Sequence, residues 1–308
     1  MKVHRNNQLY THYLQISNQH TMAPVDVFRK GANALITGGA SGVGLAVAKL
    51  CASHSMNIIL VDNNNEKLQS AKSSLSNTNG SVTTHSLDVS SLSAWSELKD
   101  TLASSSTTLD FLHLNAGIGA KGDWTDNQYF HKIFDTNLFG VVNGINTFFP
   151  HFSGAQGGGS QGQQKAIVIT GSKQGITNPP GNAAYNASKA AIKSLTEHLS
   201  YDLAQTAPDT SVHLLVPGWT FTGLTGGGKT TEKPAGAWSA EQVADFLYKK
   251  MGEGKFYAIC PDNDVDWDTD RRRMLWTAGD VVYERLPMSR WREEYKDQAK
   301  KEMEGMKL

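Results

Sequence analysis

The 308-residue sequence predicts an α/β fold in which a doubly wound, seven-stranded parallel sheet is flanked by helices. Three observations lead to this fold class. Short apolar runs of strand length alternate with helix-length segments from residue 33 onward, the pattern of a parallel sheet with crossover helices. A glycine-rich turn follows the first run. The second run ends in an acidic residue, Asp62.

Seven apolar runs are predicted as strands, at residues 34–37, 57–62, 82–87, 111–114, 166–170, 212–216 and 256–260. They fit a single domain over residues 31–262, of normal size for this class. Residues 1–30 are polar and lack apolar periodicity, so we expect a flexible arm; a mitochondrial presequence or a downstream start at Met22 would also fit. Residues 263–308 should form a helical extension, with a charged helix around residues 289–295.

Composition argues against several classes of partner. The net charge is zero, so nothing indicates binding to nucleic acid or to an anionic membrane surface. The 39% of hydrophobic residues occur in short runs, none near the roughly 18 residues of a membrane span. Cys51 and Cys260 lie far apart in apolar surroundings and form no metal or redox spacing. We therefore expect two buried free thiols and a cytoplasmic protein without a bound metal.

Two glycine-rich segments interrupt the pattern. Residues 153–164 have the composition of a flexible surface loop with no further role. Residues 223–236 follow a strand end, where active-site loops occur, and are a candidate lid. The acidic run at residues 262–270 is more typical of turns and helix caps than of a metal site.

The first glycine turn predicts a dinucleotide site of the Rossmann type. Its sequence runs from Thr37 through Gly38, Ser41, Gly42 and Val43 to Gly44, directly after the first strand and at the start of a helix. Glycines at this place let a pyrophosphate meet the helix N-terminus. The alternative, a plain strand-to-helix turn, would not require an acid at the end of the next strand.

Asp62 supplies that acid and predicts the choice of cofactor. Its carboxylate can accept hydrogen bonds from the adenosine ribose, and it repels a 2'-phosphate. Ser41 and residues 63–65 provide no basic side chain to attract such a phosphate. NAD is therefore favoured over NADP.

The catalytic candidates lie between residues 172 and 189. Tyr185 and Lys189 are four apart, so they share one face of a helix and the ammonium can favour the ionised phenol. A charge about 4 Å away at an effective dielectric of about 20 contributes roughly 4 kcal/mol. This predicts a Tyr185 phenol whose pKa falls from near 10 toward neutrality. Ser172 follows a buried strand and places a hydroxyl at the strand end.

In this order and spacing, the motifs resemble those of the short-chain dehydrogenase/reductases, in their shorter single-domain form, over about residues 31–262. The matching residues are Thr37, Gly38, Gly42, Val43, Gly44, Asp88, Asn115, Ala116, Gly117, Asn137, Ser172, Tyr185, Lys189, Pro217, Gly218 and Thr222. His113-Leu114 before Asn115, and Trp219 after Gly218, depart from the common pattern; the first should alter packing and the second the substrate pocket. The tail after Cys260 looks similar to that of some fungal members.

The resemblance implies further roles. Asp88 would fix the adenine, and Asn115, Ala116 and Gly117 would line the adenosine side. Thr220 and Thr222 would hold the nicotinamide end, and Val89, Pro217 and Gly218 would also bind the cofactor. Asn137 would bend a helix and anchor a water leading to Lys189, which would also bind the nicotinamide ribose. Members commonly pair through the helix that carries the tyrosine, so we expect a homodimer or homotetramer.

The function predicted is an NAD(H)-dependent interconversion of a secondary alcohol and a ketone. Tyr185 would transfer the proton, Ser172 would hydrogen-bond the substrate oxygen, Lys189 would tune the phenol and Asn137 would complete a proton path. Five aromatic residues border the expected pocket and suggest an apolar or aromatic substrate: Trp124, Tyr129, Trp219, Phe221 and Trp238. The alternatives are a redox-silent scaffold that isomerises or cyclises a metabolite, and an NAD-sensing protein.

Overall fold

The computed structural model describes residues 26–153, 163–225 and 232–308. The residues before 26, most of the loop predicted at 153–164 and part of the candidate lid at 223–236 lie outside these ranges. Within the described residues, no helix combines the length and the apolar character needed to cross a membrane.

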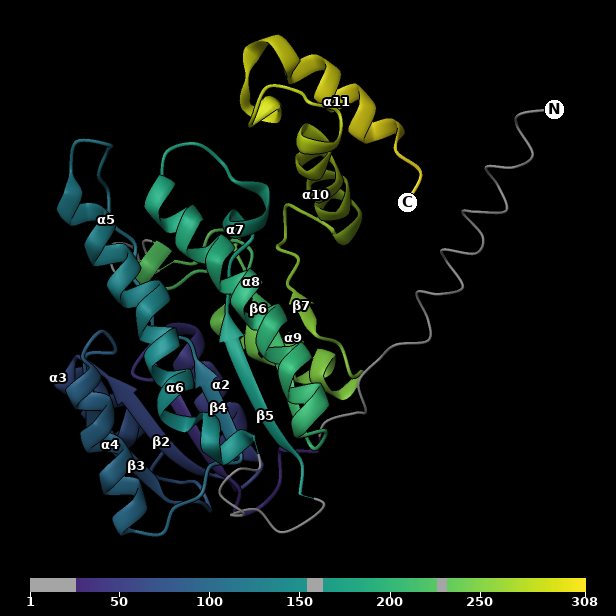
Figure 1. The fold of residues 1–308 in the computed structure, drawn as a ribbon. Helices are drawn as coiled ribbons and strands as arrows, with labels where there is room; N and C mark the ends of the chain where they lie inside the picture. The colour runs from purple at the N-terminus through teal and green to yellow at the C-terminus, as the bar shows by residue number, and fades with distance from the viewer. Residues whose placement is uncertain (1–25, 154–162, 226–231) are drawn as a thin grey trace.

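A seven-stranded parallel sheet forms the centre of the molecule, as predicted (Figure 1). The strands, in the order β3-β2-β1-β4-β5-β6-β7, are paired in parallel throughout. Their bounds are β1 Asn33–Thr37, β2 Asn57–Asp62, β3 Val82–Ser86, β4 Phe111–Leu114, β5 Lys165–Thr170, β6 Thr210–Val216 and β7 Tyr257–Ile259. The order reverses between β1 and β4, and in such sheets ligands bind at this switch point, beyond the carboxyl ends of the strands.

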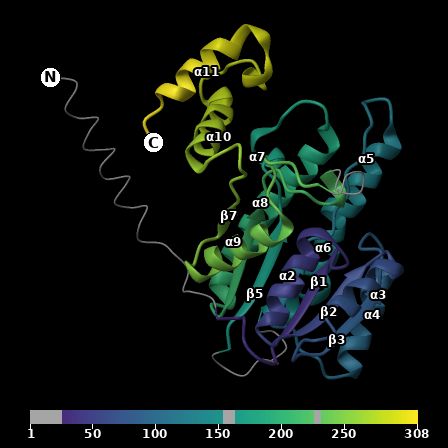
Figure 2. The same ribbon diagram turned by 180° about the vertical axis from the view of Figure 1, so that it is seen from behind.

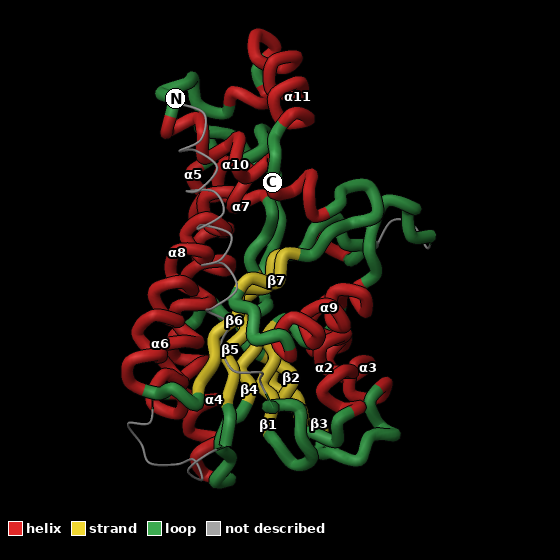
Figure 3. The backbone as a smooth tube through the Cα atoms, turned by 90° about the vertical axis from the view of Figure 1, so that its right-hand side faces the viewer, coloured by secondary structure: helices red, strands yellow, loops and turns green. Residues whose placement is uncertain are grey.

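Helices cover both faces of the sheet. Their bounds are α2 Gly42–Ser53, α3 Asn65–Ser74, α4 Leu92–Ser104, α5 Asn127–Phe134, α6 Gly140–Phe152, α7 Gln174–Thr177, α8 Ala183–Thr206 and α9 Ala240–Gly252. Helices α4, α6 and α8 lie on the face seen in Figure 1, and α2 and α9 on the face seen from behind in Figure 2. Figure 3 shows the sheet edge-on between these two layers.

Alternate residues of each strand fill two separate cores. Ala34 and Ile36 of β1 pack with α2 and α9, whereas Leu35 packs with α4, α6 and α8. Because both faces are covered, the central strands read as continuous apolar runs. Each fully buried large side chain, such as Trp95 or Phe148, contributes about 1.5 to 3 kcal/mol relative to an exposed one. Cys51 and Cys260 are buried and free, as predicted.

The ends of the chain differ in detail from the expectation. Val27 and Phe28 are buried in the core and Arg29 pairs with Asp110 at 2.6 Å, so the folded part includes residues before 31. After β7 the chain forms α10 Trp267–Val282 and α11 Lys296–Gly305, which lie beyond the carboxyl edge of the sheet (Figure 1).

The prediction of a charged helix around residues 289–295 is wrong. Two 3-10 turns, Ser289–Trp291 and Glu293–Tyr295, occupy this segment. Met288 adopts a left-handed conformation with φ 59° and Arg292 is extended, so helical backbone cannot continue through either residue. The charged helix begins at Lys296 instead.

Candidate active site

A cleft of about 790 Å³ opens at the carboxyl edge of the sheet and gathers residues from six segments of the chain. The predicted site residues that line it are Gly38, Ser41, Gly42, Val43, Asp62, Asn115, Ala116, Gly117, Ser172, Tyr185, Lys189, Pro217, Gly218, Thr220 and Thr222. Four predicted residues do not line it: Gly44, Asp88, Val89 and Asn137. Several lining residues were not singled out from the sequence: Lys67, Ile118, Gly119, Thr170, Gly171, Lys173 and Gln174. The start of the candidate lid, Gly223 to Thr225, also contributes.

Tyr185 lies in the first turn of α8 and shares a hydrogen bond with Ser172. Burial raises the pKa of the Tyr185 phenol, and the hydrogen bond with Ser172 opposes this effect only in part. The hydroxyl of Ser172 also accepts from the backbone N–H of Gln174 at 3.2 Å. This bond holds the serine at the end of β5, next to the phenol.

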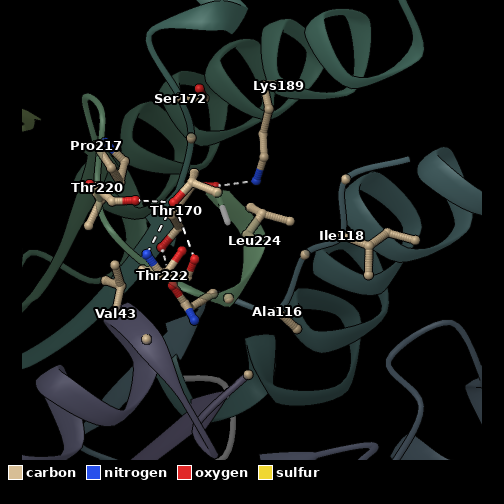
Figure 4. Close-up of a pocket in the computed structure, with 18 of the residues that line it drawn as sticks. Val43, Ala116, Ile118, Thr170, Ser172, Lys189, Pro217, Thr220, Thr222 and Leu224 are labelled. Atoms are coloured by element: carbon tan, nitrogen blue, oxygen red, sulfur yellow. Dashed lines mark hydrogen bonds between the residues drawn. The ribbon is translucent and has the colours of Figure 1, made fainter. Parts of the chain in front are cut away.

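Lys189 is buried one turn further along α8 and reaches toward Thr170 (Figure 4). Its Nζ donates to the carbonyl of Thr170 at 2.8 Å and lies 5.8 Å from the centre of the Tyr185 ring. Burial lowers the pKa of Lys189 to about 8. The lysine therefore loses its proton before the phenol does.

This order of titration corrects the prediction for Tyr185. The predicted fall of the phenol pKa requires a lysine that is still charged when the phenol ionises. Burial disfavours both the phenolate and the ammonium, so it raises the pKa of Tyr185 and lowers the pKa of Lys189. The prediction of a phenol pKa near neutrality is therefore wrong.

Asn137 occupies a π-helical turn, Asp135–Phe139, between α5 and α6. Such turns insert one extra residue and are a common place for a helix to bend, which is consistent with the predicted bend. The Asn137 side chain is fully buried; it accepts from Ile118 N at 2.8 Å and donates to Ile118 O at 2.9 Å. A Cβ added to Gly117 would lie 3.3 Å from Asn137 Oδ1 and 3.7 Å from Lys189 Nζ. The loop after β4 thus passes between these two polar groups.

A hydrogen-bond network that the sequence did not reveal joins the ends of three strands. Thr37 Oγ1 accepts from Asn115 N at 2.9 Å and from Ala116 N at 3.0 Å. Thr170 Oγ1 donates to Asn115 Oδ1 at 3.1 Å, so it accepts from Nε2 of the buried His113 at 2.9 Å. Burial lowers the pKa of His113 to about 3. His113 therefore does more than alter the packing, because it supports the threonine whose carbonyl binds Lys189.

The glycine turn has the shape that a dinucleotide requires. Gly38 and Gly42 have φ of +62° and +53°, and a Cβ at Gly44 would lie 2.2 Å from the carbonyl oxygen of Gly38. The N-cap residue Ser41 makes no side-chain capping bond and the first turn of α2 contains no acid. The N-terminus of α2 is thus suited to an anion such as a pyrophosphate. Gly44 supports this turn from behind.

Asp62 and Lys67 lie at the far end of the cleft. Asp62 Oδ2 accepts from Ala40 N at 3.3 Å, and its Oδ1 accepts from Asn64 N at 3.0 Å. Lys67 comes from the start of α3, which the side chain of Asn64 caps by accepting from Lys67 N at 2.9 Å. The cleft therefore contains a cation close in sequence to the predicted ribose-binding acid.

Asp88 and Val89 form a turn after β3. Asp88 Oδ1 accepts from Ser90 N at 3.0 Å, and the carbonyl of Val89 accepts from the indole of Trp95 at 2.8 Å. Both residues stabilise the loop, and the structure does not bring them into the lining of the cleft.

Of the five aromatic residues predicted to border the substrate pocket, only Trp219 lines the cleft. The aliphatic Ile118 and Leu224 line it as well. Tyr129 is buried beneath α8, and its hydroxyl accepts from Ala184 N at 3.2 Å, at the start of that helix. Trp124, Phe221 and Trp238 do not line the cleft; Trp124 is 82% exposed and Trp238 packs on Phe246.

Known proteins are similar to this chain in sequence and in fold. A family model described as short chain dehydrogenase matches residues 32–233. A cyclopentanol dehydrogenase of Comamonas testosteroni is 33% identical over 172 residues, which span 55% of this chain and 66%, slightly under two thirds, of that protein. A 1-deoxy-11-beta-hydroxypentalenate dehydrogenase of Streptomyces avermitilis is 28% identical over 80% of this chain and 94% of its own length.

A solved structure shows the same fold. It is a short chain dehydrogenase/reductase from Burkholderia phymatum in complex with NAD, with 26% identity and a TM-score of 0.73. The similarity covers 84% of this chain and 96% of that chain. Because the family model spans more than half of the sequence and the sheet order and site geometry agree with it, the chain belongs to the short-chain dehydrogenase family.

Proposed function

We propose that the protein is a nicotinamide-dependent oxidoreductase that interconverts a secondary alcohol and a ketone. The observation that carries this proposal is the meeting of Ser172, Tyr185 and Lys189 in one cleft with the glycine turn and Asp62. The nicotinamide cofactor, when bound, accepts or supplies the hydride. Gly38, Ser41 and Gly42 would hold its pyrophosphate, and Lys189 and Thr222 would hold the opposite end.

The chain's own residues handle the proton. In reduction, Tyr185 donates its phenolic proton to the ketone oxygen, to which Ser172 also donates a hydrogen bond. Because burial raises the pKa of Tyr185, the phenol is protonated near neutral pH, which is the form that reduction requires. In oxidation the phenolate accepts the alcohol proton, so the oxidation rate should increase with pH.

Asp62 favours NAD over NADP as the cofactor. Its carboxylate lines the cleft at the end of β2, where it can accept from both ribose hydroxyls. The similar protein from Burkholderia phymatum was solved in complex with NAD, which agrees with this choice. Lys67 lines the same part of the cleft and acts in the opposite sense, because its charge attracts a phosphate.

The substrate class we propose is an apolar, cyclic secondary alcohol or its ketone. Trp219, Leu224 and Ile118 supply the apolar lining, and Trp219 and Leu224 are 45% and 51% exposed, which leaves apolar surface for a substrate to cover. The two relatives described above are named for the oxidation of cyclopentanol and of 1-deoxy-11-beta-hydroxypentalenate. The two buried thiols also suit a reducing compartment, so we propose a cytoplasmic enzyme.

We also propose that the enzyme is a homodimer or homotetramer that pairs through α8. Leu195 and Tyr201 on this helix are 38% and 69% exposed, which suits an interface between copies of the chain. Light scattering at micromolar concentration checks the assembly, and a monomeric mass would reject it.

The test of the proposed function is a panel of cyclic and linear alcohols and ketones, each with NAD(H) and NADP(H). The absorbance of the reduced nicotinamide reports turnover. Reduction of at least one cyclic ketone is expected. Cofactor binding without turnover of any substrate would instead favour an NAD-sensing protein. Conversion of a substrate without a change in absorbance would favour a redox-silent scaffold.

A further inference from the structure

Lys173, directly after Ser172, holds its ammonium between two carboxylates that come from beyond the sheet. Its Nζ lies 3.4 Å from Asp262 Oδ2 and 2.5 Å from Asp270 Oδ2. The three side chains are only 15%, 7% and 4% exposed. In a buried group of this kind, loss of the Lys173 ammonium would leave two carboxylates without compensation, and loss of either carboxylate would remove one of the two contacts that place the ammonium.

Asp262 also connects this group to the loop after β6. Its Oδ2 accepts from the backbone N–H of Trp219 at 3.1 Å. A Cβ at Gly218 would lie 2.7 Å from Asp262 Oδ2 and 3.1 Å from Lys173 Cε. The absence of a side chain at Gly218 thus allows this loop to lie directly against the ion pair.

Asp270 connects the same group to the C-terminal extension. It lies in the first turn of α10, and α10 packs against α7, the short helix that follows Lys173 (Figure 1). The carbonyl of Lys173 accepts from Ile176 N at 3.0 Å and Thr177 N at 2.9 Å, so Lys173 begins that helix. A carboxylate of the extension is therefore bound to the residue next to Ser172.

We propose that Lys173, Asp262 and Asp270 are positioning residues through which α10 fixes Ser172 and the loop of residues 217–222 around the cleft. The proposal rests on the proposed function, since it concerns the placement of Ser172 for proton transfer. The ammonium of Lys173 is bound to the two carboxylates, so it acts on the reaction through its neighbours. The extension is thereby part of the active-site structure.

Asp270→Asn tests the proposal, because it removes one charge while Asp262 keeps its bonds to Lys173 and Trp219. Displacement of Ser172 should lower kcat, because the serine would no longer be placed to bind the substrate oxygen. We therefore expect kcat of Asp270→Asn to fall about tenfold, while the substrate KM stays within about threefold of the wild-type value. Asp270→Glu retains the charge and should restore most of kcat. Asp280→Asn is the matched control, because Asp280 is a buried carboxylate of the same helix that binds Arg285 and Ser289 instead.

Hydrogen exchange of residues 174–178 gives a second readout that does not depend on turnover. These amides should exchange faster in Asp270→Asn and at the wild-type rate in Asp280→Asn. Unchanged exchange and a kcat within about twofold of wild type in Asp270→Asn would overturn the proposal, as would an equal loss in Asp280→Asn. If the wild type turns over no substrate, the proposed function fails, and the exchange rates still decide whether the cluster holds this segment. If Asp270→Asn does not fold, Lys173→Met carries the same expectations, with Lys173→Arg as the conservative variant.

Discussion

The ammonium of Lys189 is buried, and it donates a hydrogen bond to the carbonyl of Thr170. Burial lowers its pKa from the ordinary 10.5 to about 8, so the folded protein binds this proton less tightly than the unfolded chain does. The cost of the buried charge is fully present below about pH 8. It disappears as the pH rises from about 8 to about 10.5, a difference of about 3 kcal/mol.

Lys189→Met should remove this pH dependence. Between about pH 8 and pH 10, the unfolding free energy of the wild type should rise relative to that of the variant, because methionine has no proton to lose. Urea unfolding at a series of pH values measures the difference. Two curves that stay parallel over this range would show that the ammonium of Lys189 is not destabilised by burial.

We propose that the opposing charges of Asp62 and Lys67 set the choice between NAD and NADP. Each hydrogen bond from the ribose to the Asp62 carboxylate contributes roughly 1.5 to 3 kcal/mol. The kcat/KM value with NAD should therefore be at least about tenfold higher than that with NADP. Asp62→Ala should reduce this ratio of kcat/KM values, and Lys67→Met should increase it, because the variant lacks the cation that attracts a 2'-phosphate. Lys72→Met, in the last turn of the same helix, is the control. A wild-type enzyme that prefers NADP would contradict the assignment of Asp62.

The sequence predicted the place of Asp62 in the cleft. The order of first strand, glycine turn, helix and second strand fixes where the second strand ends, and Asp62 lies at that end. The sequence did not indicate Lys67, because a lysine near a helix start is usually solvated and only the fold brings Lys67 into the lining of the cleft. The pKa of Tyr185 was predicted with the wrong sign for a related reason. Spacing along a helix gives the distance between two groups, but it does not give their burial.

At the scale of elements, five of the seven strands, β1, β2, β4, β5 and β6, end in segments that contribute to the cleft, and α2 begins where the first of these segments ends. The central strands could be predicted because their apolar runs are long and continuous. A helix bend at Asn137 was expected from the family resemblance alone, and the π-helical form of that turn was not predicted. The 3-10 turns at residues 289–295 were missed because a left-handed Met288 and an extended Arg292 are not visible in a charge pattern.

Gly44→Ala tests how closely α2 must approach the glycine turn. The added Cβ would lie 2.2 Å from the carbonyl of Gly38, so the turn must move. Cofactor affinity should fall at least about tenfold, because the turn orients the N–H groups for the pyrophosphate. Gly252→Ala at the end of α9 is the matched control, since a Cβ there meets nothing within 4 Å. Equal cofactor affinities in the two variants, measured by titration, would show that this contact is unimportant.

At the scale of the whole molecule, the C-terminal extension lies beyond the carboxyl edge of the sheet (Figure 1), and its Asp270 pairs with Lys173, which lines the cleft. The sheet and most of the cleft could be predicted from the sequence. They depend on patterns of apolar runs, glycines and polar residues that lie within about 30 residues of one another. The ion pair between Lys173 and Asp270 depends on how α10 packs, which a sequence pattern does not reveal. The acidic run at 262–270 could therefore be interpreted from the sequence only as turns and helix caps. Asp266 does cap α10, accepting from Thr269 N at 2.7 Å, whereas Asp262 and Asp270 pair with Lys173.

The central claim is that Tyr185 transfers a proton to the substrate oxygen. The most direct measurement compares kcat for a cyclic ketone between wild type and Tyr185→Phe, with the cofactor Kd of each protein from titration. The variant lacks the phenolic oxygen and keeps the ring, so its Kd should stay within about threefold while kcat falls by about 10² to 10⁴. A variant that retains kcat within a few fold of wild type would contradict the claim.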